Sequence, residues 1–253
     1  MSLLKITGLS KSFGGVHAVR DVSFSVEAGK IYSVIGPNGA GKTTLFNLIT
    51  GVYTPDAGTI HLRDEPIQGI PPDQLASRGV ARTFQNLQIC MNMTALENVM
   101  VGAHLHLDRN FLKAALGLPT LRKNDRLLAQ EAAALMDLVG LGRHITARAD
   151  SLSYGLLKRL EIARALAMKP SVIFLDEPAA GLNPRETDEV AELIEKVRDT
   201  QVTIVLVEHD MKMVMKLSDR ILVMDYGKKL AEGSAAEVRS NPDVIAAYLG
   251  ASV

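Results

Sequence analysis

The sequence GPNGAGKTT at residues 36–44 decides the fold of this chain. It fits the phosphate-binding pattern G-x-x-x-x-G-K-[ST] at Gly36, Gly41, Lys42 and Thr43. The apolar run KIYSVI before it predicts a buried strand, and TLFNLIT after it predicts a helix. Glycines let the backbone fold tightly around a polyphosphate, and the start of a helix offers it free N–H groups. A chance glycine-rich turn is the alternative, and it does not account for this order of strand, loop and helix.

The same stretch predicts that the chain binds a nucleoside triphosphate together with Mg²⁺. We expect Lys42 to reach the β- and γ-phosphates and the Thr43 hydroxyl to bind the magnesium ion. The residues expected around the phosphates are Gly36, Pro37, Asn38, Gly39, Gly41, Lys42, Thr43 and Thr44.

A second apolar run ends in two carboxylates. The residues VIFL are typical of a strand covered on both faces, and Asp176 and Glu177 follow at once. Because open parallel sheets bind ligands at the carboxyl ends of their strands, we expect Asp176 to support the magnesium ion and Glu177 to face the attacking water. The alternative is a strand that simply ends in solvated acids. The run VTIVLV repeats the pattern, which brings His209 to the same edge of the sheet.

Other parts of the sequence leave two interpretations open. Residues 3–13 alternate as an exposed-edge strand does, and Phe13 at its end could stack on a purine ring or simply pack against a neighbour. Ser153 and Gly155 open a predicted helix, where an anion site and ordinary capping use the same residue types. Residues 86–141 are rich in helix formers with apolar spacings of three and four, which predicts a helical insertion.

Composition limits the classes of function. Lys and Arg total 28 and so do Asp and Glu, so no net positive field gathers nucleic acid. The single cysteine, Cys90, excludes an internal disulfide and suits a reducing compartment. No apolar run approaches the ~20 residues that span a bilayer, and the first residues lack a signal-peptide pattern. We therefore expect a cytoplasmic protein whose membrane role, if it has one, needs separate chains.

Taken together, the motifs resemble the ATP-binding subunit of ABC transporters over essentially the whole chain. GPNGAGKT is similar to the Walker A motif, VIFLDE to Walker B, LSYGL to the signature motif and AAGLNP to the D-loop, with Gln85 at the Q-loop and His209 at the switch histidine. The segments ARTFQN, LSYGLLKRLEIARAL and DEPAAGLNP most resemble those of the LivG-type ATPases of branched-chain amino acid importers.

The resemblance implies roles that spacing alone does not give. It implies a head-to-tail dimer in which Ser153 and Gly155 contact the γ-phosphate held by the Lys42 of the other protomer. It makes Glu177, His209 and Gln85 the catalytic residues, with Gln85 also a magnesium ligand and a link to the membrane subunits. It makes Phe13 the adenine-stacking residue.

The resemblance also implies an architecture and a set of partners. The fold class is α/β, a P-loop NTPase core with an antiparallel β subdomain and an inserted helical subdomain. Residues 1–253 form one nucleotide-binding domain, with the core and β subdomain at 1–85 and 170–253 and the helical subdomain at 86–169. The partners are integral-membrane permeases, a second ATPase subunit and, indirectly, a substrate-binding protein, on the inner face of the cell membrane.

Two residues depart from the family pattern, Leu156 at the usual glutamine of the signature and Asn183 at the D-loop aspartate. They leave open whether the dimer is a homodimer or a paralogous heterodimer. A soluble ABC ATPase that acts on nucleic acid or the ribosome is the rival function. Zero net charge and a single nucleotide-binding domain count against it.

Overall fold

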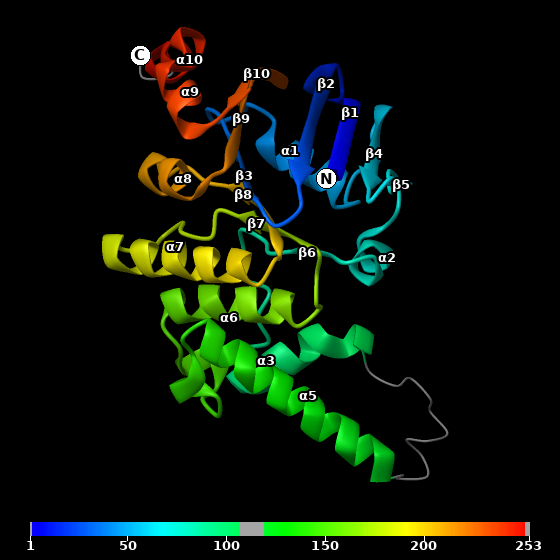
Figure 1. Cartoon of the computed structure of the whole chain (residues 1–253), viewed down its shortest axis with the longest axis vertical. Helices are drawn as coiled ribbons and strands as arrows, with labels where there is room; N and C mark the ends of the chain where they lie inside the picture. The colour runs from blue at the N-terminus through cyan, green and yellow to red at the C-terminus, as the bar shows by residue number, and fades with distance from the viewer. Residues whose placement is uncertain (1, 107–118, 251–253) are drawn as a thin grey trace.

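The larger sheet of the molecule carries the phosphate-binding sequence. The computed structural model describes residues 2–106 and 119–250, and Figure 1 shows the described elements packed in layers. The sheet has the strand order β10-β9-β3-β8-β7-β6, in which all neighbours from β9 to β6 are parallel and β10 is antiparallel to β9. Its strands are β3 (Ile31–Ile35), β6 (Val80–Arg82), β7 (Val172–Asp176), β8 (Thr203–Val207), β9 (Arg220–Asp225) and β10 (Lys228–Gly233).

Every residue of β3, β7 and β8 is buried, as expected for parallel strands covered on both faces. The predicted α/β class is thereby confirmed. At the edge of this sheet β6 ends at Arg82, and Gln85 lies in the irregular segment that follows.

A second sheet is antiparallel, with the order β2-β1-β4-β5. The prediction of an exposed-edge strand at residues 3–13 is wrong, because β1 pairs with β2 on one side and with β4 on the other. Leu4 and Ile6 of β1 are buried while Lys5 and Thr7 are exposed, so the alternation marks one buried face rather than a sheet edge. The strands are β1 (Ser2–Phe13), β2 (Val16–Glu27), β4 (Ala57–Leu62) and β5 (Glu65–Pro66).

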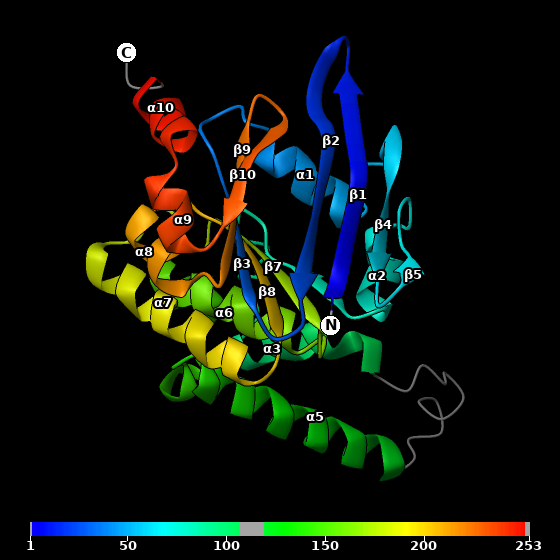
Figure 2. The same ribbon diagram turned by 45° about the horizontal axis from the view of Figure 1, so that its top comes forward.

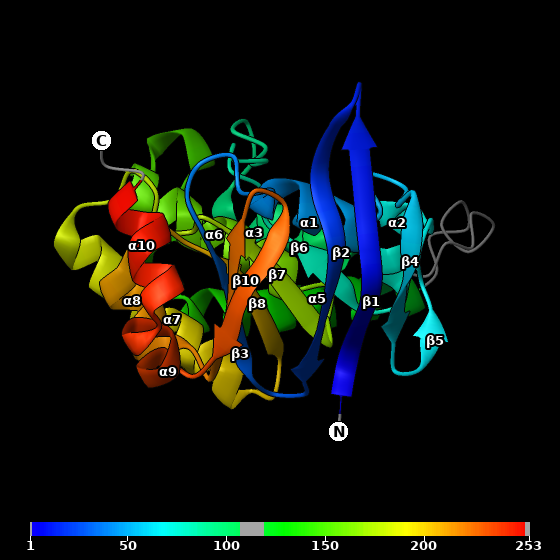
Figure 3. The same cartoon turned by 90° about the horizontal axis from the view of Figure 1, so that it is seen from above.

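Two hydrophobic clusters cover the two faces of the larger sheet. One joins the sheet to α1 and the antiparallel sheet, and Figures 2 and 3 show the β1–β2 hairpin beside α1. The other joins it to α3, α5, α6 and α7, and α6 lies between the sheet and α5 in Figure 1. The helices are α1 (Lys42–Ile49), α2 (Pro72–Ser77), α3 (Ala95–Gly102), α5 (Pro119–Leu138), α6 (Tyr154–Leu166), α7 (Pro184–Asp199), α8 (Met211–Leu217), α9 (Ala235–Ser240) and α10 (Pro242–Gly250).

Residues 86–169, the predicted helical subdomain, contain α3, α5 and α6, which pack against one another. One short 3-10 turn follows α3, two lie between α5 and α6, and residues 107–118 lie outside the described residues. Among the helices that the structure describes, none is both long and apolar enough to cross a bilayer.

Two glycines of the phosphate loop allow close approaches that fix its shape. A Cβ on Gly36 would lie 2.2 Å from the carbonyl oxygen of Met224, and one on Gly41 would lie 2.2 Å from that of Ala18. Both glycines have positive φ angles, 152° and 97°. The loop is therefore held against β9 and β2 in a conformation that a side chain would oppose.

Candidate functional site

The carboxyl edge of the larger sheet gathers the predicted polar residues. Val34 of β3 pairs with Val207 of β8, and Val207 pairs in turn with Asp176 of β7. The phosphate loop, Glu177 and His209 therefore follow their strands at the same edge, as the sequence predicts.

Lys42 lies folded onto its own loop. Its Nζ atom donates to the carbonyl oxygens of Gly36 at 2.8 Å and Pro37 at 3.1 Å, and the residue is 6% exposed. Burial lowers the pKa of the Lys42 ammonium, while the nearby carboxylates Glu177 and Asp176 act in the opposite direction. The Lys42 ammonium is thus largely removed from solvent within the phosphate loop.

The rest of the phosphate loop leaves polar groups in solvent. Asn38, Gly39 and Thr43 are exposed, and Thr44 is half-buried. Gly41, in the left-handed region, begins α1 without a side-chain cap, so the first N–H groups of the helix are open to a ligand. The geometry suits a polyphosphate.

Asp176 is buried, and among the described residues only one of its two carboxylate oxygens has a hydrogen-bond partner. Its Oδ2 atom accepts from Nη2 of Arg82 at 2.9 Å, while its Oδ1 atom is buried without a hydrogen-bond partner. Burial raises the pKa of the Asp176 carboxyl, although the hydrogen bond and charge of Arg82 oppose the shift. An orphaned carboxylate oxygen suits a hard cation such as Mg²⁺, which binds proteins through oxygen ligands. Phosphate oxygens and the Thr43 hydroxyl belong to the same donor class.

Glu177 and His209 meet directly. The Nε2 atom of His209 and Oε1 of Glu177 lie 2.8 Å apart, and the two side chains are 47% and 19% exposed. Glu177 has a φ of 51°, and its N–H donates to the carbonyl of Val207. The backbone therefore turns Glu177 out of the strand towards His209.

The sequence interpretation assigned no role to Glu208, which directly follows β8. It is 4% exposed and accepts from the backbone N–H groups of Ala179, His209 and Asp210, at 2.7, 2.9 and 3.4 Å. It therefore joins the segment after β7 to the segment after β8. A buried carboxylate at the end of an apolar strand was the available signal.

The structure does not join the other predicted site residues to the phosphate loop. Gln85 is exposed, and its carbonyl accepts from Lys158 Nζ at 3.4 Å. Ser153 caps α6, where its Oγ accepts from the N–H of Leu156, and Gly155 lies buried in the first turn. Phe13 is 42% exposed and meets Tyr53 edge-on, with ring centroids 5.2 Å apart. The predicted roles of these residues stay predictions.

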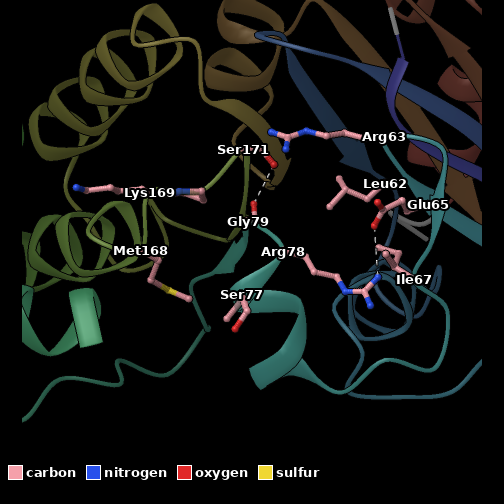
Figure 4. Close-up of a pocket in the computed structure, with 12 residues that line it drawn as sticks. Leu62, Arg63, Glu65, Ile67, Ser77, Arg78, Gly79, Met168, Lys169 and Ser171 are labelled. Carbon is pink, nitrogen blue, oxygen red and sulfur yellow. Dashed lines mark hydrogen bonds and ion pairs between the residues drawn. The ribbon is translucent and has the colours of Figure 1, made fainter. Parts of the chain in front are cut away.

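A cavity of about 600 Å³ lies away from this edge. It is lined by residues at the ends of β4 and α2 and by the segment that precedes β7, including Arg63, Arg78 and Ser171. Figure 4 shows Arg78 turned towards Glu65, and Ser171 hydrogen-bonded to Gly79. Because Gly79 and Ser171 precede β6 and β7, the cavity lies at the opposite ends of these strands from Asp176.

Comparisons with known proteins agree with this geometry. The ABC transporter family matches residues 19–180, and the family described as branched-chain amino acid ATP-binding cassette transporter matches residues 228–253. The chain is 48% identical to the high-affinity branched-chain amino acid transport ATP-binding protein BraF of Pseudomonas aeruginosa and 47% identical to LivG of Escherichia coli. Each comparison covers 98% of both chains.

Solved structures show the same fold. An ATP-binding cassette of an ABC transporter in its ADP conformation superposes with a TM-score of 0.86 at 31% identity, covering 99% of both chains. A nucleotide-free cassette superposes with a TM-score of 0.85, covering 98% of this chain and 99% of the other. The expected P-loop NTPase fold is confirmed, and no comparison supports the nucleic-acid alternative. The chain therefore belongs to the ATP-binding subunits of ABC transporters, a family of Mg²⁺-dependent ATPases.

Proposed function

We propose that this ATPase powers the uptake of branched-chain amino acids. The observation that carries the proposal is its near-50% identity, over almost the full length, to two transport ATPases named for these solutes. The match of residues 228–253 to a branched-chain amino acid cassette family supports it independently. The chain itself would work on the inner face of the cell membrane, bound to separate permease subunits and, through them, served by a substrate-binding protein.

The site residues have distinct roles in this proposal. Lys42 leaves the carbonyls of its own loop to bind the β- and γ-phosphates, and backbone N–H groups of residues 38–44 surround them. Thr43, Asp176 and Gln85 hold Mg²⁺, which neutralises phosphate charge when it is bound. Phe13 stacks on the adenine.

Hydrolysis requires a positioned water. Glu177 accepts a hydrogen bond from that water, and His209 holds Glu177 in place and contacts the γ-phosphate. Because positioning and charge stabilisation supply most of the catalysis of phosphoryl transfer, the fixed Glu177–His209 pair is the central catalytic feature.

A second protomer completes the site in this proposal. Ser153 and Gly155 of one chain contact the γ-phosphate on the other through the start of α6, whose N-cap is Ser153 itself. Residues 1–85 and 170–253 form the ATP-binding core and β subdomain, and residues 86–169 form the helical unit that carries this contact. Leu156 and Asn183 lie at the dimer seam, so either a homodimer or a paralogous heterodimer fits.

A groove beside the segment after β6 is the proposed contact with the permease. A cavity of about 260 Å³ separates α2 and β6 from α3 and α6, and Phe84, Gln88 and Val101 line it. Phe84 and Val101 are 42% and 39% exposed, so apolar surface lies open next to Gln85. A permease segment bound in this groove would contact the chain segment that contains Gln85, and through Gln85 it would be linked to the nucleotide.

The test is uptake of radiolabelled leucine, isoleucine and valine in source cells that lack the gene. The unmodified gene should restore uptake, and a gene that encodes Glu177→Gln should not. Purification of the tagged chain from detergent-solubilised membranes should recover multispanning permeases at fixed stoichiometry. Normal uptake in the deleted strain would contradict the proposed solute, and ribosomal partners in place of permeases would contradict the transport role.

A further inference from the structure

Arg82, the last residue of β6, forms a buried network that no sequence motif indicated. Its side chain is 9% exposed. Nη1 donates to Oδ1 of Asn47 at 2.6 Å and to Oγ1 of Thr50 at 2.9 Å, and Nη2 donates to Oδ2 of Asp176 at 2.9 Å. One guanidinium thus joins α1, which follows the phosphate loop, to the carboxylate at the end of β7.

Two aromatic rings restrict the plane of this guanidinium. Its central carbon lies 5.0 Å from the ring centroid of Phe84 and 5.9 Å from that of Phe46. Phe46 is fully buried in α1, whereas Phe84 is partly exposed in the groove described above. A lysine has neither the planar fork nor the stacking surface that these contacts use.

The network determines which oxygen of Asp176 is available. Arg82 occupies Oδ2, and Oδ1 remains buried with no partner among the described residues. A carboxylate held by one oxygen cannot rotate freely, so the other oxygen keeps a fixed direction. This is the usual relation between a metal-binding carboxylate and the group that orients it.

We propose that Arg82 is a positioning residue for Asp176, which it holds so that Oδ1 is free for Mg²⁺. The inference rests on the proposed role of Asp176 as a magnesium ligand. Arg82 does not itself touch the metal or the phosphates. The competing explanation is a purely structural ion pair, which would stabilise the fold and leave metal binding unchanged.

The test compares nucleotide affinity with and without the metal. A fluorescent ATP analogue is titrated onto the purified full-length chain in MgCl₂ and in EDTA, and the ratio of the two Kd values measures how much Mg²⁺ tightens binding. In Arg82→Gln this tightening should fall by about tenfold, the usual effect of removing a group that orients a metal ligand. The Kd in EDTA should stay within about twofold of that of the unmodified chain.

The matched control is Arg159→Gln. Arg159 is another mostly buried arginine, and it is paired with the carboxylate of Glu189 rather than with Asp176. Its loss should reduce thermal stability without changing the Mg²⁺ effect. Asp176→Asn supplies the second control, because in that background Arg82→Gln should cause no further loss of tightening.

The outcomes separate this inference from the proposed function. If the unmodified chain binds the analogue equally well in MgCl₂ and EDTA, the magnesium role of this site fails. If the unmodified chain shows the Mg²⁺ effect, and Arg82→Gln and Arg82→Lys both retain it within twofold, the inference about Arg82 is wrong. If Arg82→Gln does not fold, Arg82→Lys, which keeps the positive charge, provides the test in its place.

Discussion

The imidazole of His209 and the carboxylate of Glu177 lie within hydrogen-bonding distance, 2.8 Å between Nε2 and Oε1. They come from the ends of two adjacent parallel strands, β7 and β8. Glu208 holds the backbone of both segments, since it accepts hydrogen bonds from Ala179 and His209. Hydrogen bonds thus hold both of the segments that carry the pair, which suits a water-positioning group.

Glu177→Gln should abolish turnover and leave ATP binding intact. The amide keeps the size of the side chain but does not accept a proton from water, a loss worth about 10²–10⁴ in rate for general-base groups. Phosphate release measures the rate, and the fluorescent ATP analogue measures binding. Hydrolysis at the original rate would show that the catalytic carboxylate lies elsewhere.

Lys42→Ala should weaken nucleotide binding itself. The buried ammonium donates to two loop carbonyls. Its removal would deprive both carbonyls of a charge-assisted partner and would also remove the proposed contact with the phosphates. We expect at least about a tenfold rise in the Kd for ATP, equivalent to about 1.4 kcal/mol. Lys169→Ala, which removes a surface lysine paired with Glu131, is the control and should bind ATP normally. Unchanged affinity in Lys42→Ala would contradict the phosphate-loop role.

Gly36→Ala should destabilise the chain more than Gly39→Ala. A Cβ on Gly36 would meet the Met224 carbonyl at 2.2 Å, whereas one on Gly39 would meet nothing within 4 Å. Gly39 has a φ of 80°, so its substitution costs about 1–2 kcal/mol of backbone strain, and Gly36→Ala adds about 1–3 kcal/mol of overpacking. Chemical denaturation of the two variants compares these costs. Equal losses would show that the loop relaxes around the new methyl group.

The sequence alone predicted the order of the site residues along the chain and the edge of the sheet that holds them. The reason is physical: a buried parallel strand must be an apolar run, and the first polar residue after it emerges at the carboxyl edge. Asp176, Glu177 and His209 each follow such a run. The sequence pattern alone therefore predicts that these three residues come together at one edge of the sheet.

The network around Arg82 could not be predicted in the same way. Its partners come from α1 and β7, and nothing in their sequence separation marks them as neighbours. The edge position assigned to residues 3–13 failed for a related reason. Alternation shows that one face of a strand is buried, but it does not show how many strands pair with it.

Glu161 is a buried carboxylate on α6 that faces the segment after β6. It is 6% exposed and lies 3.4 Å from the N–H groups of both Phe84 and Gln88. Burial raises the pKa of the Glu161 carboxyl above its ordinary value of 4.5, and the backbone bonds together with Lys158 and Arg164 only partly offset the shift.

The sign of the pH effect follows from this direction. A raised pKa in the folded state means that the folded chain holds the proton more tightly than the unfolded chain does. The resulting stabilisation is present below pH 4.5 and is lost as the pH rises through the folded-state pKa. Glu161→Gln keeps a neutral oxygen acceptor at every pH. Its stability relative to the unmodified chain should therefore rise as the pH increases above 4.5.

Thermal unfolding of both chains from pH 5 to pH 8 checks this prediction. Glu97→Gln is the control of opposite sign, because the backbone N–H of Thr94 lowers the pKa of the exposed Glu97 carboxyl. The stabilisation from Glu97 is present above pH 4.5 and is lost as the pH falls, so its variant should be the less stable one at pH 8. If Glu161→Gln lowers stability by the same margin at pH 5 and pH 8, the prediction is wrong. The carboxylate would then stabilise the fold through its hydrogen bonds. If Glu161→Gln gains relative stability between pH 5 and pH 8 while the deficit of Glu97→Gln stays constant over the same range, burial, rather than the loss of a glutamate as such, determines the pH dependence.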